Sequence, residues 1–153
     1  MILPLEDFTP ASPISPLVLV GVCAAGKSTL AHGLQVRGIQ SRAVAQEHSQ
    51  VPTLYRRSGN LVVLLVADWG TVHRRRHLAW DPGFYRAEWE RIRLARDEAA
   101  LVIHTDWLNP QQVANRVTEW YDARLGFDNV WRSRPELADA EQARIRAQWQ
   151  TAR

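Results

Sequence analysis

The sequence predicts an α/β fold, a doubly wound parallel sheet in three layers with helices on both faces. Short apolar runs at residues 17–20, 61–67 and 101–104 alternate with stretches of helical periodicity. Strands that alternate with helices form parallel sheets, because each helix crosses back over the sheet before the next strand begins. The run 61–67 is apolar throughout, as expected for a strand covered on both faces.

The strands are predicted at residues 17–20, 41–46, 61–67 and 101–104. The helices are predicted at residues 27–37, 71–79, 82–100, 110–125 and 136–150. Turn and cap residues set these limits. Leu30, Leu34 and Val36 should face inward on the first helix, which Gly38 closes. Thr71 should cap the second helix, and Asp81-Pro82 marks the start of the third. Gly126 should end the fourth.

Composition narrows the class of protein. The 153 residues suffice for one domain with a sizeable core, and the net charge of +3 is too small to indicate nucleic-acid binding by itself. One cysteine excludes an internal disulfide and indicates no metal cluster. No apolar run reaches the length of a membrane span, and the N-terminus lacks a basic signal region. We therefore expect a cytoplasmic protein, monomeric or homodimeric, with no membrane partner.

The first predicted strand runs directly into residues 21–28, GVCAAGKS, which fit the phosphate-loop pattern G-x-x-x-x-G-K-[ST]. In this motif the glycines let backbone N–H groups converge on phosphate oxygens, the lysine reaches the β- and γ-phosphates, and the hydroxyl ligates magnesium. Lys27 is the only lysine among the 19 Lys and Arg residues. The predicted nucleotide-binding residues of the loop are Gly21, Cys23, Ala24, Ala25, Gly26, Lys27, Ser28 and Thr29.

Over residues 17–125 the chain resembles P-loop kinases of the nucleoside-monophosphate kinase and dephospho-coenzyme A kinase type. The resemblance rests on residues 21–28, on the arginine-bearing helix after the third strand, and on the stretch 99–106. It implies a P-loop NTPase fold with a reduced number of strands, and ATP and Mg²⁺ as cofactors. Residues 1–16, rich in proline, would form an extended N-terminal arm, and residues 126–153 a C-terminal helical extension.

Two acidic residues compete for the role of orienting magnesium and its waters. Asp68 closes the apolar strand at 61–67, and Glu47 follows the second strand beside His48. In many kinases that the chain resembles, an acid at the place of Glu47 activates the acceptor hydroxyl. We favour Glu47 as acceptor contact or general base and Asp68 as magnesium ligand or helix cap, with surface acids at strand ends as the alternative for both.

Arginines are the candidates for stabilising a phosphoryl group in transfer, because guanidinium groups bind its oxygens through paired N–H donors. Residues 74–76 are three successive arginines on one predicted helix, so only one or two can face the phosphates. Arg75 and Arg76 are the expected ones, against a solvated face as the alternative. Arg56 and Arg57 are candidates for an anionic acceptor. Trp107, just past the last strand, is expected to border the adenine.

The expected function is a small ATP-dependent kinase that moves the γ-phosphoryl group of Mg·ATP to an anionic or hydroxyl-bearing small molecule. A hydrolytic P-loop switch is one alternative, although the sequence contains no N-K-x-D guanine signature. A nucleotide-binding module without catalysis is the other, favoured by the short segment between the second and third strands. The motifs do not indicate which acceptor would be used.

Overall fold

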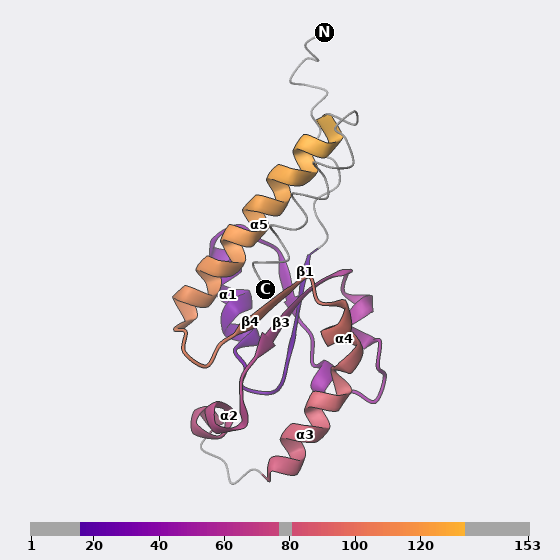
Figure 1. Ribbon diagram of the computed structural model, residues 1–153, viewed down its shortest axis with the longest axis vertical. Coiled ribbons are helices and arrows are strands. Elements are labelled where there is room, and N and C mark those ends of the chain that lie inside the picture. The colour runs from indigo at the N-terminus through magenta and orange to yellow at the C-terminus, as the bar shows by residue number, and fades with distance from the viewer. Residues whose placement is uncertain (1–15, 77–80, 134–153) are drawn as a thin grey trace.

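A computed structural model of the chain describes residues 16–76 and 81–133, with side chains as far as residue 124. Figure 1 shows the arrangement of its elements. The strands are β1 (Leu17–Gly21), β2 (Ser41–Ala43), β3 (Leu61–Val66) and β4 (Leu101–His104). The α-helices are α1 (Lys27–Val36), α2 (Trp69–Arg76), α3 (Pro82–Arg91), α4 (Arg93–Glu98) and α5 (Pro110–Ser133). Two short 3₁₀ turns, η2 (Gln46–His48) and η3 (Leu54–Arg57), lie between β2 and β3.

The four strands form one sheet in the order β2-β1-β3-β4, and every pairing in it is parallel. This confirms the predicted α/β class and the parallel sheet. The central strand β1 pairs with β3 along its whole length, from Leu17 opposite Leu61 to Gly21 opposite Leu65. All residues of β1 are buried, and so is β3 up to its last residue. Burial of every consecutive side chain means that both faces of these strands are covered.

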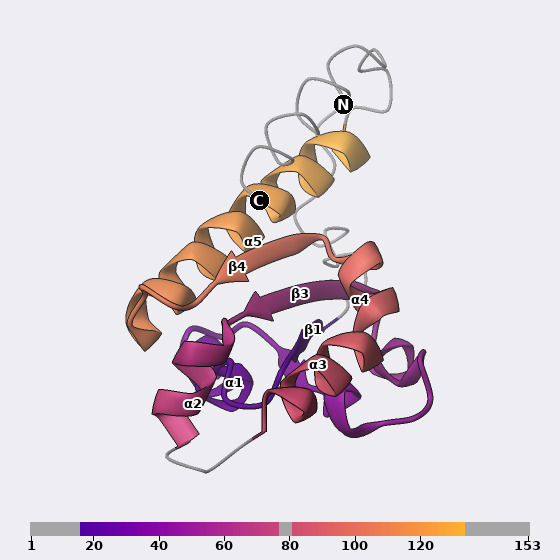
Figure 2. The same ribbon diagram turned by 60° about the horizontal axis from the view of Figure 1, so that its bottom comes forward.

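Helices flank this sheet. Helix α1 packs against β1, β2 and α5, and α4 packs against β3. The contact between α1 and α5 includes hydrogen bonds from the Arg37 guanidinium, which follows α1, to Thr118 and Asn115. Helix α5 starts near the carboxyl ends of the strands and runs back beyond the opposite end of the sheet (Figure 1). Figure 2 shows α3 and α4 following one another along the sheet.

Three helix limits differ from the prediction. Helix α2 begins at Trp69, because the Asp68 carboxylate accepts a hydrogen bond from the Thr71 N–H at 2.8 Å. Asp68 is therefore the N-cap, and Thr71 is buried within the first turn. The stretch predicted as one helix over 82–100 is divided at Ile92 into α3 and α4. Gly126 does not end the last helix, since α5 continues to Ser133.

Other local predictions also need correction. Val36 is 75 % exposed rather than turned inward, whereas Leu30 and Leu34 are buried as predicted. The second strand ends at Ala43 instead of residue 46, and Gln46 begins the turn η2. Asp81 caps α3 as predicted, accepting from the Gly83 N–H at 2.7 Å.

Some predicted elements fall outside the described residues. These are residues 1–15 of the arm, the end of the helix predicted at 71–79, and the last helix at 136–150. The chain division at residues 16/17 and 125/126 therefore stays a prediction. Within residues 16–76 and 81–133, no helix is both long and apolar enough to span a bilayer.

Candidate functional site

The loop between β1 and α1 occupies the carboxyl end of the central strand. Each of its two glycines, Gly21 and Gly26, is favoured for a different physical reason. A Cβ at Gly21 would lie 2.6 Å from the backbone oxygen of Leu65, so a side chain there would force β1 and β3 apart. Gly26, the last residue before α1, has φ +106°, a conformation that L side chains rarely adopt. Glycine is therefore favoured at Gly21 by the spacing of the strands and at Gly26 by the backbone conformation that precedes α1.

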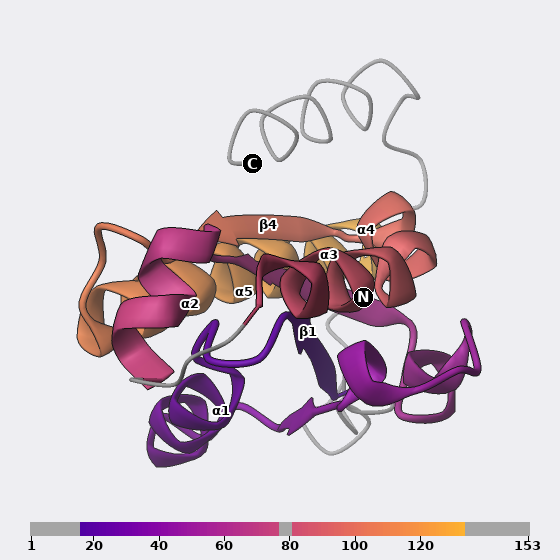
Figure 3. The same cartoon turned by 90° about the horizontal axis from the view of Figure 1, so that it is seen from below.

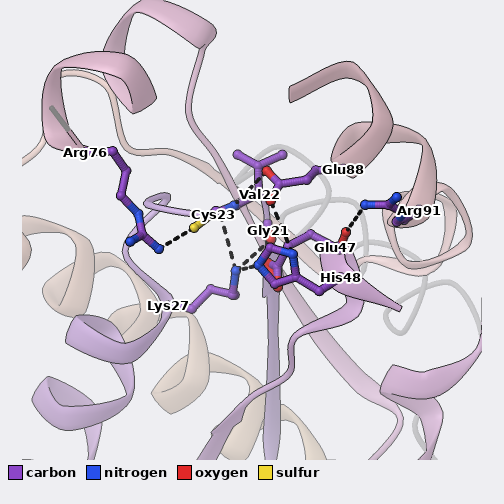
Figure 4. Close-up of polar contacts among 9 residues, drawn as sticks. All are labelled: Gly21, Val22, Cys23, Lys27, Glu47, His48, Arg76, Glu88 and Arg91. Carbon is purple, nitrogen blue, oxygen red and sulfur yellow. Dashed lines mark hydrogen bonds and ion pairs between the residues drawn. The ribbon is translucent and has the colours of Figure 1, made fainter. Parts of the chain in front are cut away.

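Lys27 lies folded back over this loop. Its ammonium group donates to the backbone oxygens of Gly21 at 2.7 Å and Val22 at 3.3 Å, and it forms an ion pair with the carboxylate of Glu47 (Figure 4). Both side chains are largely buried, 12 % exposed for Lys27 and 2 % for Glu47. Glu47 reaches Lys27 from η2, so the structure brings these two predicted site residues into direct contact.

The turn that presents Glu47 is held in place by Gln46. The Gln46 amide donates to the backbone oxygens of Val51 at 2.8 Å and Arg91 at 3.3 Å, and accepts from the Tyr55 N–H at 3.0 Å. The Arg91 guanidinium in turn donates to the backbone oxygen of Glu47 at 3.1 Å. Gln46 is fully buried. Sequence reasoning missed it because a polar residue after a strand carries no signal of burial.

A second anchor fastens the far end of the same segment. Tyr55 and Arg56 both donate to the carboxylate of Glu98 on α4. Burial, together with the hydrogen bond to Glu98, raises the pKa of Tyr55 to about 12. The hydrogen bonds from Arg56 and Tyr55 lower the pKa of Glu98 below its usual value. Arg56 therefore ties the segment to α4, and neither Arg56 nor Arg57 lines the pocket described below.

The three arginines of α2 point in different directions, as expected for successive residues of a helix. Arg75 donates to the backbone oxygens of Ala24 at 2.9 Å and Thr105 at 2.8 Å, which links α2 to the phosphate loop and to the end of β4. Arg76 donates to the sulfur of Cys23. Among the described residues, Arg74 donates to Thr71 on its own helix, at 3.2 Å. The structure thus brings Arg75 and Arg76 to the loop, and that they face phosphates stays a prediction.

A pocket of about 680 Å³ opens over the loop. Figure 3 shows α2 and the start of α1 grouped at the end of the sheet to which the strand arrows point. The residues from Cys23 to Leu30 form one wall. Charged and polar groups from other segments form the second: Glu47, His48, Arg75, Arg76 and Thr105. Leu108, Pro110 and Val113, around the start of α5, supply an apolar end.

Thr105 is a site residue that the sequence did not reveal. It follows β4 directly and is 2 % exposed. Its hydroxyl lies 3.1 Å from the backbone oxygen of Ala25 and accepts from the Arg75 guanidinium at 3.2 Å. Thr105 therefore couples the phosphate loop to α2. Its place at the carboxyl end of a predicted parallel strand is the signal that could have found it.

Glu88 on α3 was also missed, because its place in a polar helix gave no sign of burial. It is 3 % exposed, and its carboxylate accepts from the Cys23 N–H at 3.3 Å and lies 3.6 Å from the His48 imidazole (Figure 4). Burial raises the pKa of Glu88, while the Cys23 N–H and His48 act in the opposite direction. Neighbouring Glu47 adds to the rise in the pKa of Glu88.

Two predicted site residues lie elsewhere. Asp68 is exposed and does not line the pocket; its carboxylate caps α2, and its N–H donates to Asp106 at 2.8 Å. The prediction of Asp68 as a magnesium ligand is therefore not supported, and its alternative role as helix cap is what the structure has. Trp107 is 90 % exposed and does not line the pocket, so the structure does not bring it to the other predicted site residues.

Ser28 and Thr29 line the pocket from the first turn of α1, where a nucleotide's phosphates and their metal ion would be expected. The geometry thus joins the loop between β1 and α1, an acid, and two arginines from α2 around a single cavity. No protein-family model, no curated protein and no solved structure matches the sequence.

Proposed function

We propose that the chain is an ATP-dependent phosphotransferase with a P-loop NTPase fold of reduced strand number, doubly wound in three layers. It would transfer the γ-phosphoryl group of Mg·ATP to a small molecule that bears a hydroxyl or anionic group. One observation carries this proposal: Lys27, Glu47 and the pair Arg75–Arg76 come from three separate segments and line one pocket. A phosphate loop needs no acid and no arginine pair merely to bind an anion.

The loop and α1 supply the phosphate-binding part. Backbone N–H groups of the loop and the positive end of the α1 dipole favour a polyphosphate in the pocket. Lys27 exchanges its contacts with backbone oxygens for contacts with the β- and γ-phosphates. Ser28 would hold Mg²⁺ together with the phosphates, and Glu47 is the acid among the described residues that line the pocket. There the ion would neutralise phosphate charge.

The same exchange frees Glu47 for the acceptor. While Lys27 pairs with Glu47, the carboxylate is occupied by the ammonium group and does not face an acceptor hydroxyl. Once Lys27 turns to the phosphates, Glu47 can take the proton of the acceptor hydroxyl as its oxygen bonds to the γ-phosphorus. The bond from that phosphorus to the β–γ bridging oxygen breaks, and ADP leaves.

Arg75 and Arg76 would stabilise the charge on the equatorial oxygens of the phosphoryl group in transfer. Leu108, Pro110 and Val113 form an apolar surface of the kind that receives a nucleobase, in place of the predicted Trp107.

ATP turnover with and without a library of candidate acceptors tests the proposal, after acceptors have been selected by thermal stabilisation alongside a non-hydrolysable ATP analogue. A kinase forms ADP in proportion to a phosphorylated acceptor. ADP without any acceptor product would replace the proposal by a hydrolytic switch, and ATP binding without turnover by a binding module. If calorimetry detects no ATP binding at all, the nucleotide site itself is refuted.

A further inference from the structure

We propose that Cys23, His48 and Glu88 form a binding site for a transition metal ion of the zinc class, distinct from the magnesium that accompanies a nucleotide. Their ligand atoms, one from each residue, all lie within 4.8 Å of one another. The residues come from the phosphate loop, from η2 and from α3, so the site exists only in the folded chain. It goes beyond the proposed function, which uses none of these side-chain donors.

Glu88 contacts both of the other residues, while the Cys23 sulfur is directed at Arg76 (Figure 4). The Glu88 carboxylate accepts from the Cys23 N–H through Oε2, and its Oε1 faces the Nδ1 of His48 at 3.6 Å (Figure 4). Each residue is set by its own element: Cys23 by the loop, His48 by the turn that Gln46 holds, and Glu88 by the buried face of α3. Closing these ligands on one ion therefore requires small movements of side chains rather than of the backbone.

Glu88 also has a reason to accept a cation. Its carboxylate is 3 % exposed, and within the described part of the chain its polar contacts are one backbone N–H and an imidazole 3.6 Å away. A buried carboxylate with so little compensation is costly in free energy. A divalent ion shared with Cys23 and His48 would supply the missing charge.

The donor set selects the kind of metal. Sulfur, imidazole nitrogen and carboxylate oxygen together suit Zn²⁺, whereas Mg²⁺ requires oxygen ligands in octahedral geometry. Three protein ligands leave one position of a tetrahedral ion open to water or to another oxygen. Cys23 and His48 line the nucleotide pocket, so this open position would lie at the wall of that pocket beside Glu47.

One neighbour competes with the metal. The Arg76 guanidinium donates to the Cys23 sulfur, and a metal-bound thiolate must give up part of that contact. Arg76 is not one of the three proposed ligands. Arg76→Ala therefore changes the surroundings of Cys23 and leaves all three ligands in place. We expect this variant to bind zinc at least as tightly as the parent chain.

The test is a titration of the full chain with Zn²⁺ against a chromophoric chelator, repeated with Co²⁺ as a spectroscopic probe and without nucleotide. The parent should bind one ion per chain, and its cobalt form should show a thiolate-to-cobalt charge-transfer band. Cys23→Ser should abolish that band. Cys23→Ser, His48→Gln and Glu88→Gln should each weaken Zn²⁺ binding by more than tenfold, since even partners outside the ligand shell change affinity by roughly 10–100-fold.

His32→Gln, at an exposed histidine outside the cluster, is the matched control and should keep both the band and the affinity, while Arg76→Ala should keep the band and bind zinc at least as tightly as the parent. Parent-like zinc affinity in Cys23→Ser and His48→Gln would overturn the proposal, and so would a cobalt spectrum without a thiolate band. If Glu88→Gln does not fold, the other two variants still decide the matter, because Ser conserves the size of Cys23 and His48 is exposed. A negative result leaves ATP binding unaffected, so the two proposals fail separately.

Discussion

Lys27 has two competing sets of partners. In the structure its ammonium group is bound by two backbone oxygens and by the buried carboxylate of Glu47. A nucleotide would offer phosphate oxygens in their place. Because Glu47 is 2 % exposed, whatever removes Lys27 also leaves a buried carboxylate without its cation. The lysine thus has a structural role in addition to the one that the motif predicts.

A double-mutant cycle separates the two roles. Lys27→Met should abolish ATP binding and also lower the free energy of unfolding by about 1–3 kcal/mol, the usual cost of a buried polar group that loses its partner. Adding Glu47→Gln removes the uncompensated charge and should recover most of the stability, but no ATP binding. Calorimetry and urea denaturation measure the two quantities. Equal stability of the parent and Lys27→Met would show that the ion pair contributes nothing to folding.

At the scale of the elements, the approach of β1 to β3 sets the geometry of the loop. Gly21 is the last residue of β1, and the missing Cβ lets the Leu65 carbonyl come close. The same residue supplies one of the backbone oxygens that hold Lys27. Strand spacing and lysine position are therefore linked through one glycine.

Gly21→Ala and Gly33→Ala form a matched pair. The new Cβ of Gly21→Ala would meet the Leu65 backbone oxygen at 2.6 Å, so we expect a destabilisation of about 1–3 kcal/mol or more from overpacking. In α1, the Cβ of Gly33→Ala meets only the Ala114 side chain at ordinary contact distance, and better helix propensity should stabilise the chain by about 0.5–1 kcal/mol. Thermal unfolding of both variants checks the opposite signs.

The anchor between η3 and α4 should appear in the pH dependence of stability. Arg56 and Tyr55 lower the pKa of Glu98 below its usual value of 4.5. Their contribution to folding is therefore present above pH 4.5 and is lost as the pH falls through the lowered pKa. Unfolding curves from pH 7 to pH 3 should show a loss of stability in the parent that is smaller in Glu98→Gln. The exposed neighbour Asp97 provides the control, and Asp97→Asn should follow the parent curve.

At the scale of the whole molecule, the site depends on elements meeting at one end of a parallel sheet. The loop after β1, the turn after β2, helix α2 after β3 and Thr105 after β4 all lie there, because parallel strands place all their carboxyl ends at one edge. Arg75 joins three of these parts through its contacts with Ala24 and Thr105. Movement of α2 on nucleotide binding would accordingly change the loop as well.

The arginines of α2 give a comparison within one helix. Arg75→Ala or Arg76→Ala should lower kcat far more than ATP affinity, since an arginine that acts in the transition state contributes about 10³-fold or more to the rate. Arg74→Ala is the control, because Arg74 contacts Thr71 on its own helix and does not line the pocket. Steady-state kinetics of ATP turnover measure kcat for each variant, and calorimetry measures its ATP affinity. If all three variants stay within about threefold of the parent kcat, α2 has no part in the chemistry.

Local patterns were sufficient for much of the fold. Continuous apolar runs identified β1, β3 and β4, and the Asp81-Pro82 pair identified the start of α3, because these features act over a few residues. Local patterns failed where distant contacts decide. Gly126 is a typical end of a helix, yet α5 continues through it. Thr71 is a good cap residue, but its own N–H donates to the Asp68 carboxylate, and Asp68 is therefore the cap.

The sequence by itself determined the parallel α/β class and the place of the glycine-rich loop between the first strand and the first helix, since each follows from the spacing of neighbouring residues. Only the tertiary structure showed that Glu47 pairs with Lys27 while Asp68 caps α2, because these contacts depend on how η2 and α2 return to the sheet. It alone placed Glu88 beside Cys23, 65 positions apart along the chain, and left Trp107 in solvent. Burial and proximity of this kind are set by packing between elements, and no local pattern contains them.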